Sequence, residues 1–488
     1  MQSGKSSSPI TAETVALAAE SFSNLRSFQN ELYVACGDPK NSGKFRVRTL
    51  SWKDPTPKTL TPLSSNVRSR VHEYGGGSFC VDSSSGDVIF TDIPSNGLYR
   101  AQRESTTGNG VAIELLMQKD SCRFADFCFV NDTTPYVVAI MEDHTNPQPA
   151  SVQNSLVAIT IDKDCTITTV ASGHDFYACP QVNREKTKLV YIAWDHPNMP
   201  WNSTHLYMQA LGPGGKPDGP PKRINAAGSL CSLQEPRWLD ENTVVFLSDT
   251  SGWYNLYQWN ELQDTSVNLY PMDTDFTEPA QGWILGLSPY VILPDKTIVL
   301  KYSCAAGTKL VHLTQDGQAA EEFDVPSSSV SSLCATKEGF YYVGGSPVEP
   351  PALWHCALRD KSCQKLLTSM DPSLLEPFQS SLSSPQRIRF PSPGVIGFAY
   401  GFYYPPSRSV SSDTTIKPPL LVKTHGGPTS RTSTTFRMDI QFWTSKGFAV
   451  LDVDYGGSTG YGRAVSCLFC LCRFGRQASD HLLSSSRV

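Results

Sequence analysis

The feature that most constrains the fold is a pair of short apolar runs that recurs seven times before residue 365. In each unit, a β-branched or aromatic run is followed by a turn rich in Asp, Ser, Gly or Asn, and then by a second short run. The units follow at intervals of roughly 40 to 56 residues, the period of four short antiparallel strands. The pairs are residues 32–35 with 45–50, 88–91 with 97–99, 136–140 with 156–159, 189–194 with 205–207, 244–247 with 255–257, 298–302 with 309–313, and 340–343 with 353–354.

This repeat predicts an all-β seven-bladed propeller over residues 31–370, preceded by an N-terminal segment, residues 1–30. Amphipathic helical patterns are nearly absent from the region. Two stacked β-sandwich domains are the alternative. The period continues without a linker-like break, which favours the propeller.

The composition shifts after the repeat. Residues 371–386 are rich in Ser and Pro and predict a linker. Residues 387–390 and 395–404 alternate around Pro391 and Gly394 and predict two antiparallel strands.

A strand, helix and strand are predicted next. The apolar runs 420–422 and 448–453 are short enough to be buried strands. Between them, apolar residues recur near helical spacing until Gly447 ends the pattern; they are Phe436, Ile440, Phe442 and Trp443. Residues 387–465 therefore predict the start of an α/β-hydrolase domain.

The turn His425-Gly426-Gly427-Pro428 follows the first of these runs. An α/β-hydrolase places one wall of its oxyanion hole at this point. We expect His425 to be structural, holding a loop whose backbone N–H groups face the oxyanion.

Ser458 lies in the one G-x-S-x-G match, residues 456–460. A nucleophile elbow turns at once into a helix, whereas here the loop continues through Gly460 and Tyr461. No Asp and His follow at triad distances. We therefore predict a structural glycine loop, with Tyr455, Ser458 and Gly460 near the site but not reactive.

Composition excludes several functions. The 488 residues carry a formal charge of −5 and show no basic excess, so no nucleic-acid partner is expected. The N-terminus lacks the apolar core of a secretory signal, and the apolar run 464–474 is too short to span a membrane. The fourteen cysteines are scattered, which favours a reducing, cytoplasmic location. No cofactor is expected, and the oligomeric state is not revealed.

Residues 466–488 show neither strand nor sustained helical periodicity and predict a tail unrelated to the preceding domain. Its Cys467, Cys470, Cys472 and His481 approach metal-ligand spacing. They match no known finger spacing, so no metal site is predicted.

A loop at residues 67–77 places two Arg, a His and a Glu before three glycines. Glu73 is expected to form an ion pair with Arg68 or Arg70. Neutralisation of a peptide ammonium by Glu73 is the alternative.

The motif HGGP, followed by QFWTSKGFAVLDVDYGGSTGYGR, resembles the prolyl oligopeptidase family of serine peptidases, in its acylaminoacyl-peptidase and dipeptidyl-aminopeptidase-like branch. The segments RSRVHEYGGG, AWDHPNMPW and SDTSGWYNLY fit the same family. The resemblance implies a propeller gating an α/β-hydrolase domain that cleaves short peptides with a Ser-Asp-His triad. It maps oxyanion donors to Gly426 and Gly427.

After residue 465 the sequence departs from the family pattern. The departure predicts a C-terminally truncated chain without a triad, inactive as given. A truncated gene model, a retained intron or an alternative isoform would each produce it, and sequencing the transcript across the codons for Ala464 to Cys467 tests this. The competing interpretation is a non-catalytic propeller that binds peptides or serves as an interaction scaffold.

Overall fold

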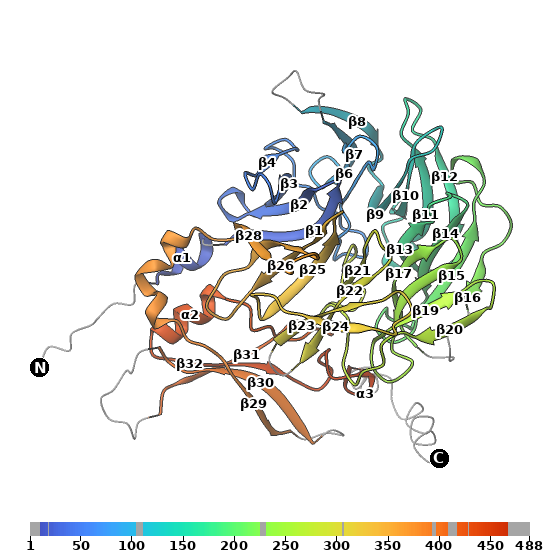
Figure 1. Ribbon diagram of the computed structural model, residues 1–488. Helices are drawn as coiled ribbons and strands as arrows, with labels where there is room; N and C mark the ends of the chain where they lie inside the picture. The colour runs from blue at the N-terminus through green and yellow to red at the C-terminus, as the bar shows by residue number, and fades with distance from the viewer. Residues whose placement is uncertain are drawn as a thin grey trace, which may run out of the picture.

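The computed structural model describes residues 10–17, 19–103, 111–224, 231–304, 307–392, 397–407, 417–427 and 429–466. The described residues form eight four-stranded sheets, of which the first seven along the chain are antiparallel. First strands of neighbouring sheets contact one another from the first sheet to the fifth and from the sixth to the seventh, and the seventh sheet contacts the first through β25 and β1 (Figure 1). The fifth and sixth sheets are joined by Arg237, which donates to Tyr290 O at 2.6 Å. This ring is the architecture of a seven-bladed β-propeller, as predicted.

The seven propeller sheets consist, in chain order, of β1 (Ser21–Phe28), β2 (Glu31–Asp38), β3 (Lys44–Ser51) and β4 (Lys58–Thr59); β5 (Phe79–Val81), β6 (Val88–Asp92), β7 (Gly97–Gln102) and β8 (Ala112–Gln118); β9 (Cys122–Val130), β10 (Tyr136–Asp143), β11 (Gln153–Thr160) and β12 (Ile167–Ser172); β13 (Phe176–Val182), β14 (Lys188–Trp194), β15 (His205–Ala210) and β16 (Lys222–Ile224); β17 (Leu233–Asp240), β18 (Thr243–Ser248), β19 (Asn255–Asn260) and β20 (Thr265–Asn268); β21 (Tyr290–Ile292), β22 (Ile298–Cys304), β23 (Gly307–Leu313) and β24 (Ala320–Phe323); β25 (Ser329–Ala335), β26 (Gly339–Gly345), β27 (Ala352–Ala357) and β28 (Cys363–Thr368). Short 3₁₀ turns, η1 (Pro39–Asn41), η2 (Pro149–Ser151) and η3 (Pro213–Gly215), interrupt the connections.

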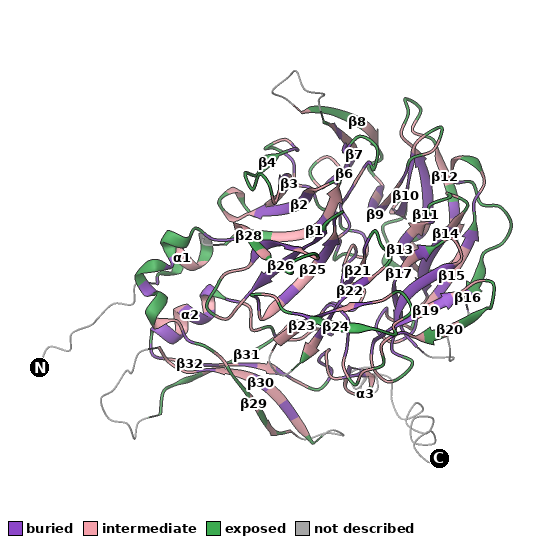
Figure 2. Cartoon of the chain, viewed as in Figure 1, coloured by how far each residue is buried: buried purple, intermediate pink, exposed green. Residues whose placement is uncertain are grey.

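The seven predicted pairs of apolar runs are the second and third strands of these sheets. These strands are the most buried because neighbouring sheets cover both of their faces (Figure 2). The first strand of the first sheet, β1, lies within residues 1–30, which the sequence analysis assigned to a segment before the propeller. Its sequence, SFSNLRSF, carries a single fully buried apolar residue, Leu25, so its period is weak.

The segment between the repeat and the eighth sheet is folded. It forms η4 (Pro372–Leu374) and η5 (Glu376–Ser381). Phe378 is buried there in a small core that also contains Ile10, just before α1 (Ala12–Leu17). The two ends of the propeller therefore pack close to the start of the next sheet.

The eighth sheet has the order β29-β30-β32-β31, built from β29 (Gln386–Pro391), β30 (Phe398–Tyr404), β31 (Leu420–Thr424) and β32 (Ala449–Asp454). β31 and β32 are parallel, and α2 (Met438–Ser445) connects them, which confirms the predicted strand–helix–strand order. Gly447 adopts a φ of 88°, the left-handed conformation that commonly follows a helix end. The sheet lies along one side of the propeller and ends at α3 (Arg463–Ser466) (Figure 1).

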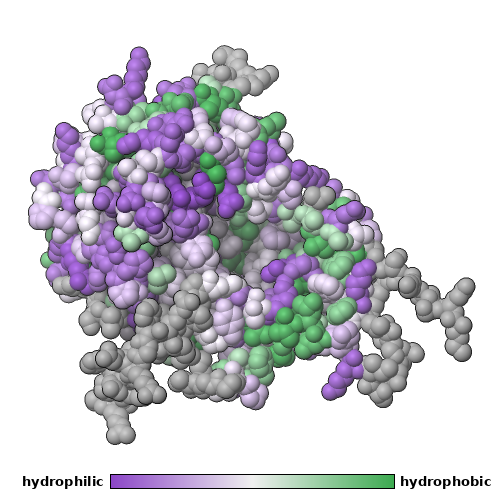
Figure 3. Space-filling model, turned by 180° about the vertical axis from the view of Figure 1, so that it is seen from behind, coloured by the Kyte–Doolittle hydropathy of each residue, from purple (hydrophilic) through white to green (hydrophobic). Residues whose placement is uncertain are grey.

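β31 is an edge strand of the eighth sheet and is poorly covered. Its Leu420 and Val422 side chains are 52% and 58% exposed. Figure 2 shows the eighth sheet as mostly intermediate or exposed, and Figure 3 shows apolar side chains gathered on the lower part of the molecule. An exposed apolar edge strand offers unpaired backbone groups to another chain.

We expect Val422→Lys to reduce self-association of the protein several-fold, because a charge on the edge opposes strand pairing between copies. Light scattering at matched protein concentration measures this. The control is Val267→Lys, at an exposed valine of the short, polar outer strand β20. An equal change in both variants would contradict a role for the β31 edge.

The cysteines are not all reduced. A disulfide joins Cys356 and Cys363, which face each other on β27 and β28. Eight other described cysteines are free, namely Cys36, Cys80, Cys122, Cys128, Cys165, Cys179, Cys304 and Cys334. The expectation of reduced thiols is therefore wrong for this pair.

No helix in the described part of the chain is long and apolar enough to cross a membrane.

Candidate functional site

The two parallel strands of the eighth sheet bring their following loops together. Parallel strands end at the same edge, so the turn after β31 meets the loop after β32. His425 Nε2 lies 2.7 Å from Ser458 Oγ. The ring of Tyr455 stacks on the imidazole with centroids 4.2 Å apart, and its hydroxyl donates to His425 O at 3.3 Å. Three of the predicted site residues thus form one cluster.

The partners of His425 define its tautomer. Nδ1 lies 2.7 Å from Gly426 O, and a carbonyl oxygen only accepts hydrogen bonds. Nδ1 therefore carries the hydrogen, and in the neutral ring Nε2 accepts from the Ser458 hydroxyl.

Ser458 is hydrogen-bonded like a nucleophile but lies where no substrate reaches it. Its side chain is 0% exposed. The Ser458 amide donates to Tyr455 O at 3.0 Å, and the Thr459 amide donates to Ser430 O at 2.8 Å. Neither amide is free to stabilise an oxyanion beside this hydroxyl.

The two glycines of the turn are exposed, and no described residue accepts a hydrogen bond from either amide. In a trans peptide the C=O and the next N–H point in opposite directions. Because His425 holds Gly426 O, the Gly427 N–H points away from the imidazole. Tyr455 Oη lies 3.4 Å from the position that a Gly427 Cβ would occupy. A Cβ there would be in van der Waals contact with the Tyr455 hydroxyl.

Gly460 lies outside this cluster and contacts the propeller. The amides of Gly460 and Gly462 both donate to Asp275 Oδ2 at 3.1 Å. Asp275 is buried and also accepts from Tyr254 N at 2.9 Å. The glycine loop therefore docks the eighth sheet onto the propeller.

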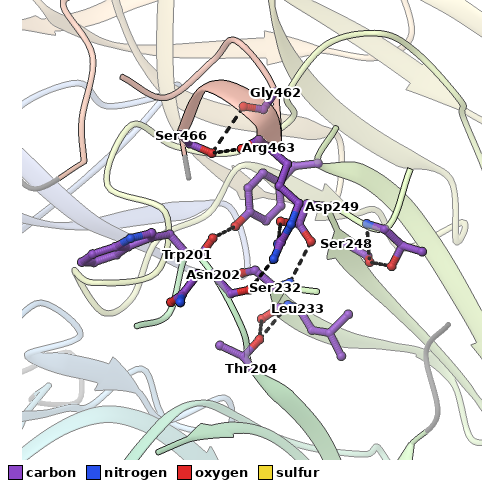
Figure 4. Close-up of polar contacts among 12 residues, drawn as sticks. Trp201, Asn202, Thr204, Ser232, Leu233, Ser248, Asp249, Gly462, Arg463 and Ser466 are labelled. Atoms are coloured by element: carbon purple, nitrogen blue, oxygen red, sulfur yellow. Dashed lines mark hydrogen bonds and ion pairs between the residues drawn. The ribbon is translucent and has the colours of Figure 1, made fainter. Parts of the chain in front are cut away.

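Arg463 completes this docking contact. Its guanidinium is ion-paired with Asp249, whose side chain is 1% exposed, and donates to Asn202 O at 2.8 Å. Asp249 also accepts from Ser232 N at 2.7 Å. Figure 4 shows Arg463 reaching from α3 into this group. Burial raises the pKa of Asp249 to about 6, although Arg463 opposes the shift. Sequence reasoning missed this pair because its members lie 214 residues apart.

A cavity of about 500 Å³ lies between the propeller and the eighth sheet. Its lining includes Trp253, Glu278 and Lys301 from the propeller and Arg431, Asp454 and Tyr461 from the other side. Lys301 is buried and ion-paired with Glu278, and burial lowers its pKa. Tyr461 donates to Asp454 Oδ2 at 2.7 Å. The cavity is polar and is formed by both parts of the chain.

Glu73 does not pair with Arg68 or Arg70. Its carboxylate accepts from Arg123 Nη1 at 2.8 Å, so the expected partners are wrong. The Glu73 side chain is 72% exposed, whereas the neighbouring His72 ring is buried.

No group of three or more His, Cys, Asp or Glu side chains among the described residues is arranged to hold a metal ion. The cysteine-rich tail with Cys467, Cys470, Cys472 and His481 lies outside the described residues.

Comparison with known proteins gives structural neighbours only. No protein-family model matches the chain, and no curated protein matches it. A puromycin-hydrolyzing peptidase of Mycobacterium tuberculosis is 27% identical, with a TM-score of 0.84, over 94% of this chain and 70% of the other. A puromycin hydrolase is 23% identical, with a TM-score of 0.85, over the same shares of 94% and 70%. An acylaminoacyl peptidase of Pyrococcus horikoshii is 12% identical, with a TM-score of 0.65, over 92% of this chain and 67% of the other.

The similarity covers 94% of this chain and therefore extends beyond the first seven sheets. The chain is therefore similar to solved peptidases, among them puromycin-hydrolyzing peptidases, an acylaminoacyl peptidase and prolyl endopeptidases, which supports the resemblance to the prolyl oligopeptidase family.

Proposed function

We propose that the chain carries the propeller and the opening of the catalytic domain of a serine peptidase that cleaves short peptides, of the acylaminoacyl- or dipeptidyl-peptidase type. In this proposal the propeller extends to residue 370, and residues 387–465 begin an α/β-hydrolase domain. The puromycin-hydrolyzing peptidase, at 27% identity, supports this substrate class.

The observation that carries the proposal is the geometry of the His-Gly-Gly turn. The Gly427 amide points away from the imidazole and has no acceptor among the described residues. Such a donor stabilises the oxyanion of a tetrahedral intermediate in acyl transfer. We assign the oxyanion wall to Gly426 and Gly427, with the Gly427 N–H as the principal donor. His425, Tyr455 and Ser458 hold the turn in place.

We further propose that this 488-residue polypeptide is inactive by itself. Among the described residues, no carboxylate bonds His425, and Ser458 is fully buried. A serine becomes a nucleophile only when a base activates it within reach of substrate. The exposed and reactive hydroxyl that the chemistry needs is not supplied by Ser458.

Labelling with a serine-directed fluorophosphonate tests this proposal. We expect the purified protein to label no more than its Ser458→Ala variant, with no hydrolysis of N-acetylated or free dipeptide anilides. An active serine peptidase serves as the positive control. Labelling that is lost in Ser458→Ala would make Ser458 a nucleophile. Tight peptide binding without labelling would instead favour the non-catalytic, peptide-binding propeller.

A further inference from the structure

The propeller contains a second cavity, whose lining is separate from that of the first. It has a volume of about 820 Å³ and is lined by first strands of the sheets around the ring. The described residues that line it and those that line the inter-domain cavity do not overlap. Both cavities meet the segment that contains strand β25. Residues 328–331 line the inter-domain cavity, and residues 333–335 line the propeller cavity.

A layer of left-handed residues separates the two cavities. Each sheet contributes one residue with a φ between 50° and 72°, at or just before its first strand. The seven residues are Asn24, Gly77, Asp126, Cys179, Glu235, Gly286 and Ser332. Five of them fall at register shifts between the first and second strands, which are β-bulges. The bulges bend the strands at one level of the ring.

Hydrogen bonds join neighbouring members of this layer. The Gly77 amide donates to Asn24 Oδ1 at 3.2 Å, and the Asp126 amide donates to Gly77 O at 2.7 Å. The Cys179 amide donates to Asp126 Oδ2 at 2.7 Å. These three bonds link four consecutive members of the layer, from Asn24 to Cys179, so these bends are not independent of one another.

A crossing strand pair closes the centre of the ring. Gly76, before the second sheet, forms a parallel bridge with Leu285, before the sixth sheet. The Leu285 amide donates to Gly75 O at 2.9 Å. The first and seventh sheets lie between these two on the shorter path around the ring, so this bond spans the axis instead of joining neighbours.

The backbones at this crossing leave no room for side chains. A Cβ on Gly76 would lie 2.1 Å from Leu285 O. A Cβ on Gly286 would lie 2.7 Å from Asn24 Oδ1 and 2.8 Å from the Gly77 backbone. Both glycines have positive φ, so a substitution there is strained as well as crowded. This approach explains Gly76 of the HEYGGG motif, whereas a Cβ on Gly75 would meet Ser69 O and a Cβ on Gly77 would meet the Asp126 backbone.

We infer that the crossing of residues 75–77 with residues 285–286 seals the propeller. Peptides then reach the inter-domain cavity from the side, between the propeller and the eighth sheet, and not along the propeller axis. The residues that select a substrate are consequently those at this side opening, including Trp253, Asp273 and Arg431. The identity of the ligand as a peptide rests on the proposed function; the seal itself does not.

Amide hydrogen exchange of the 488-residue protein tests the seal. We expect the protection factor of the Leu285 amide to lie within tenfold of that of Val138, which is paired on both sides at the centre of the third sheet. Protection more than tenfold lower would show that the crossing opens as a gate and would overturn the inference.

A matched pair of variants tests the bond that holds the layer. Asn24→Gly keeps the left-handed backbone but removes the acceptor for Gly77 N, so Leu285 should exchange about tenfold faster. The control is Asn96→Gly, another left-handed asparagine, at the turn between β6 and β7. It should leave Leu285 unchanged, and an equal response to both variants would contradict the role of Asn24. Fast exchange at Leu285 would contradict the seal but not the peptidase proposal. Fluorophosphonate labelling of Ser458 would contradict the proposed inactivity but not the seal.

Discussion

Replacing Arg463 by alanine is expected to loosen the eighth sheet from the propeller by about 3 kcal/mol, because it leaves the buried Asp249 carboxylate without its counter-ion. The Ser232 amide, which donates to this carboxylate at 2.7 Å, would remain. The lost free energy weakens the contact between the eighth sheet and the propeller. The propeller itself should keep its stability, because its hydrophobic core does not include Arg463.

The amides of Gly460 and Gly462 measure this loss directly. Both donate to Asp275 across the same contact, so their protection reports the docked state. A change of about 3 kcal/mol corresponds to roughly a hundredfold faster exchange. Arg437→Ala is the control, since Arg437 is half-exposed and its ion pair with Asp439 contributes under about 1 kcal/mol.

The effect of Arg463→Ala should depend on pH. Burial raises the pKa of Asp249 to about 6, above its ordinary value, so the folded state holds this proton more tightly than the unfolded state does. Below that pKa the carboxyl is neutral and needs no counter-ion. The exchange difference should therefore be smaller at pH 5 than at pH 8. A difference of less than about threefold at both pH values would contradict the assignment of Arg463 as the docking residue.

The elements that could be predicted from sequence are those with a clear local pattern of apolar residues. The paired runs in the middle of each blade are apolar because neighbouring sheets cover both faces, so each run is visible without its partners. Strand β1 escaped prediction because it is the innermost strand of its sheet and borders the central cavity, which Arg26 and Ser27 help to line. Its burial depends on the ring being closed, which no local window shows.

The candidate site also has one feature that local sequence predicts and one that it does not. The position of the His-Gly-Gly turn follows from the strand that precedes it. The hydrogen bond between His425 and Ser458 does not, because it depends on the parallel pairing of β31 with β32 across 33 residues. The same pairing of β31 with β32 places Ser458 against His425, and so identifies it as a structural serine and not a nucleophile. The sequence argues against Ser458 as the nucleophile because the loop continues where a nucleophile elbow would turn into a helix. The structure adds that Ser458 is completely buried and hydrogen-bonded to the imidazole.

The glycine motif at residues 75–77 shows what pattern reasoning omits. Three glycines indicate that backbone approaches closely, but not what approaches. The partner, Leu285, is more than 200 residues away along the chain and comes close only when seven sheets close a ring. His72 and Glu73 are adjacent in the same motif, yet the His72 ring packs against Phe176 and Trp194 whereas Glu73 faces solvent beside Arg123.

His72 carries the second large expected effect, a loss of stability in mild acid. The residue is partly exposed, but its ring packs against Phe176 and Trp194, and both ring nitrogens are buried without a hydrogen-bond partner in the described structure. Burial lowers the pKa of His72 to about 3, from an ordinary value of 6.5. A base with a lowered folded pKa stabilises the protein fully above its unfolded pKa, and this contribution is lost as pH falls from 6.5 towards 3.

Between pH 7 and pH 4.5, we therefore expect the parent protein to lose about 3 kcal/mol more stability than the His72→Phe variant. Phenylalanine keeps the ring packing against Phe176 and Trp194 and has no proton to accept. Urea unfolding of both proteins at the two pH values measures the difference, and His312→Phe, at a half-buried histidine bonded to Thr297, is the control. If His72→Phe and the parent lose equal stability on acidification, then the His72 ring accepts its proton inside the folded propeller. The packing around residues 67–77 would then have to open before the rest of the ring unfolds, because a charged imidazole has no partner at this position.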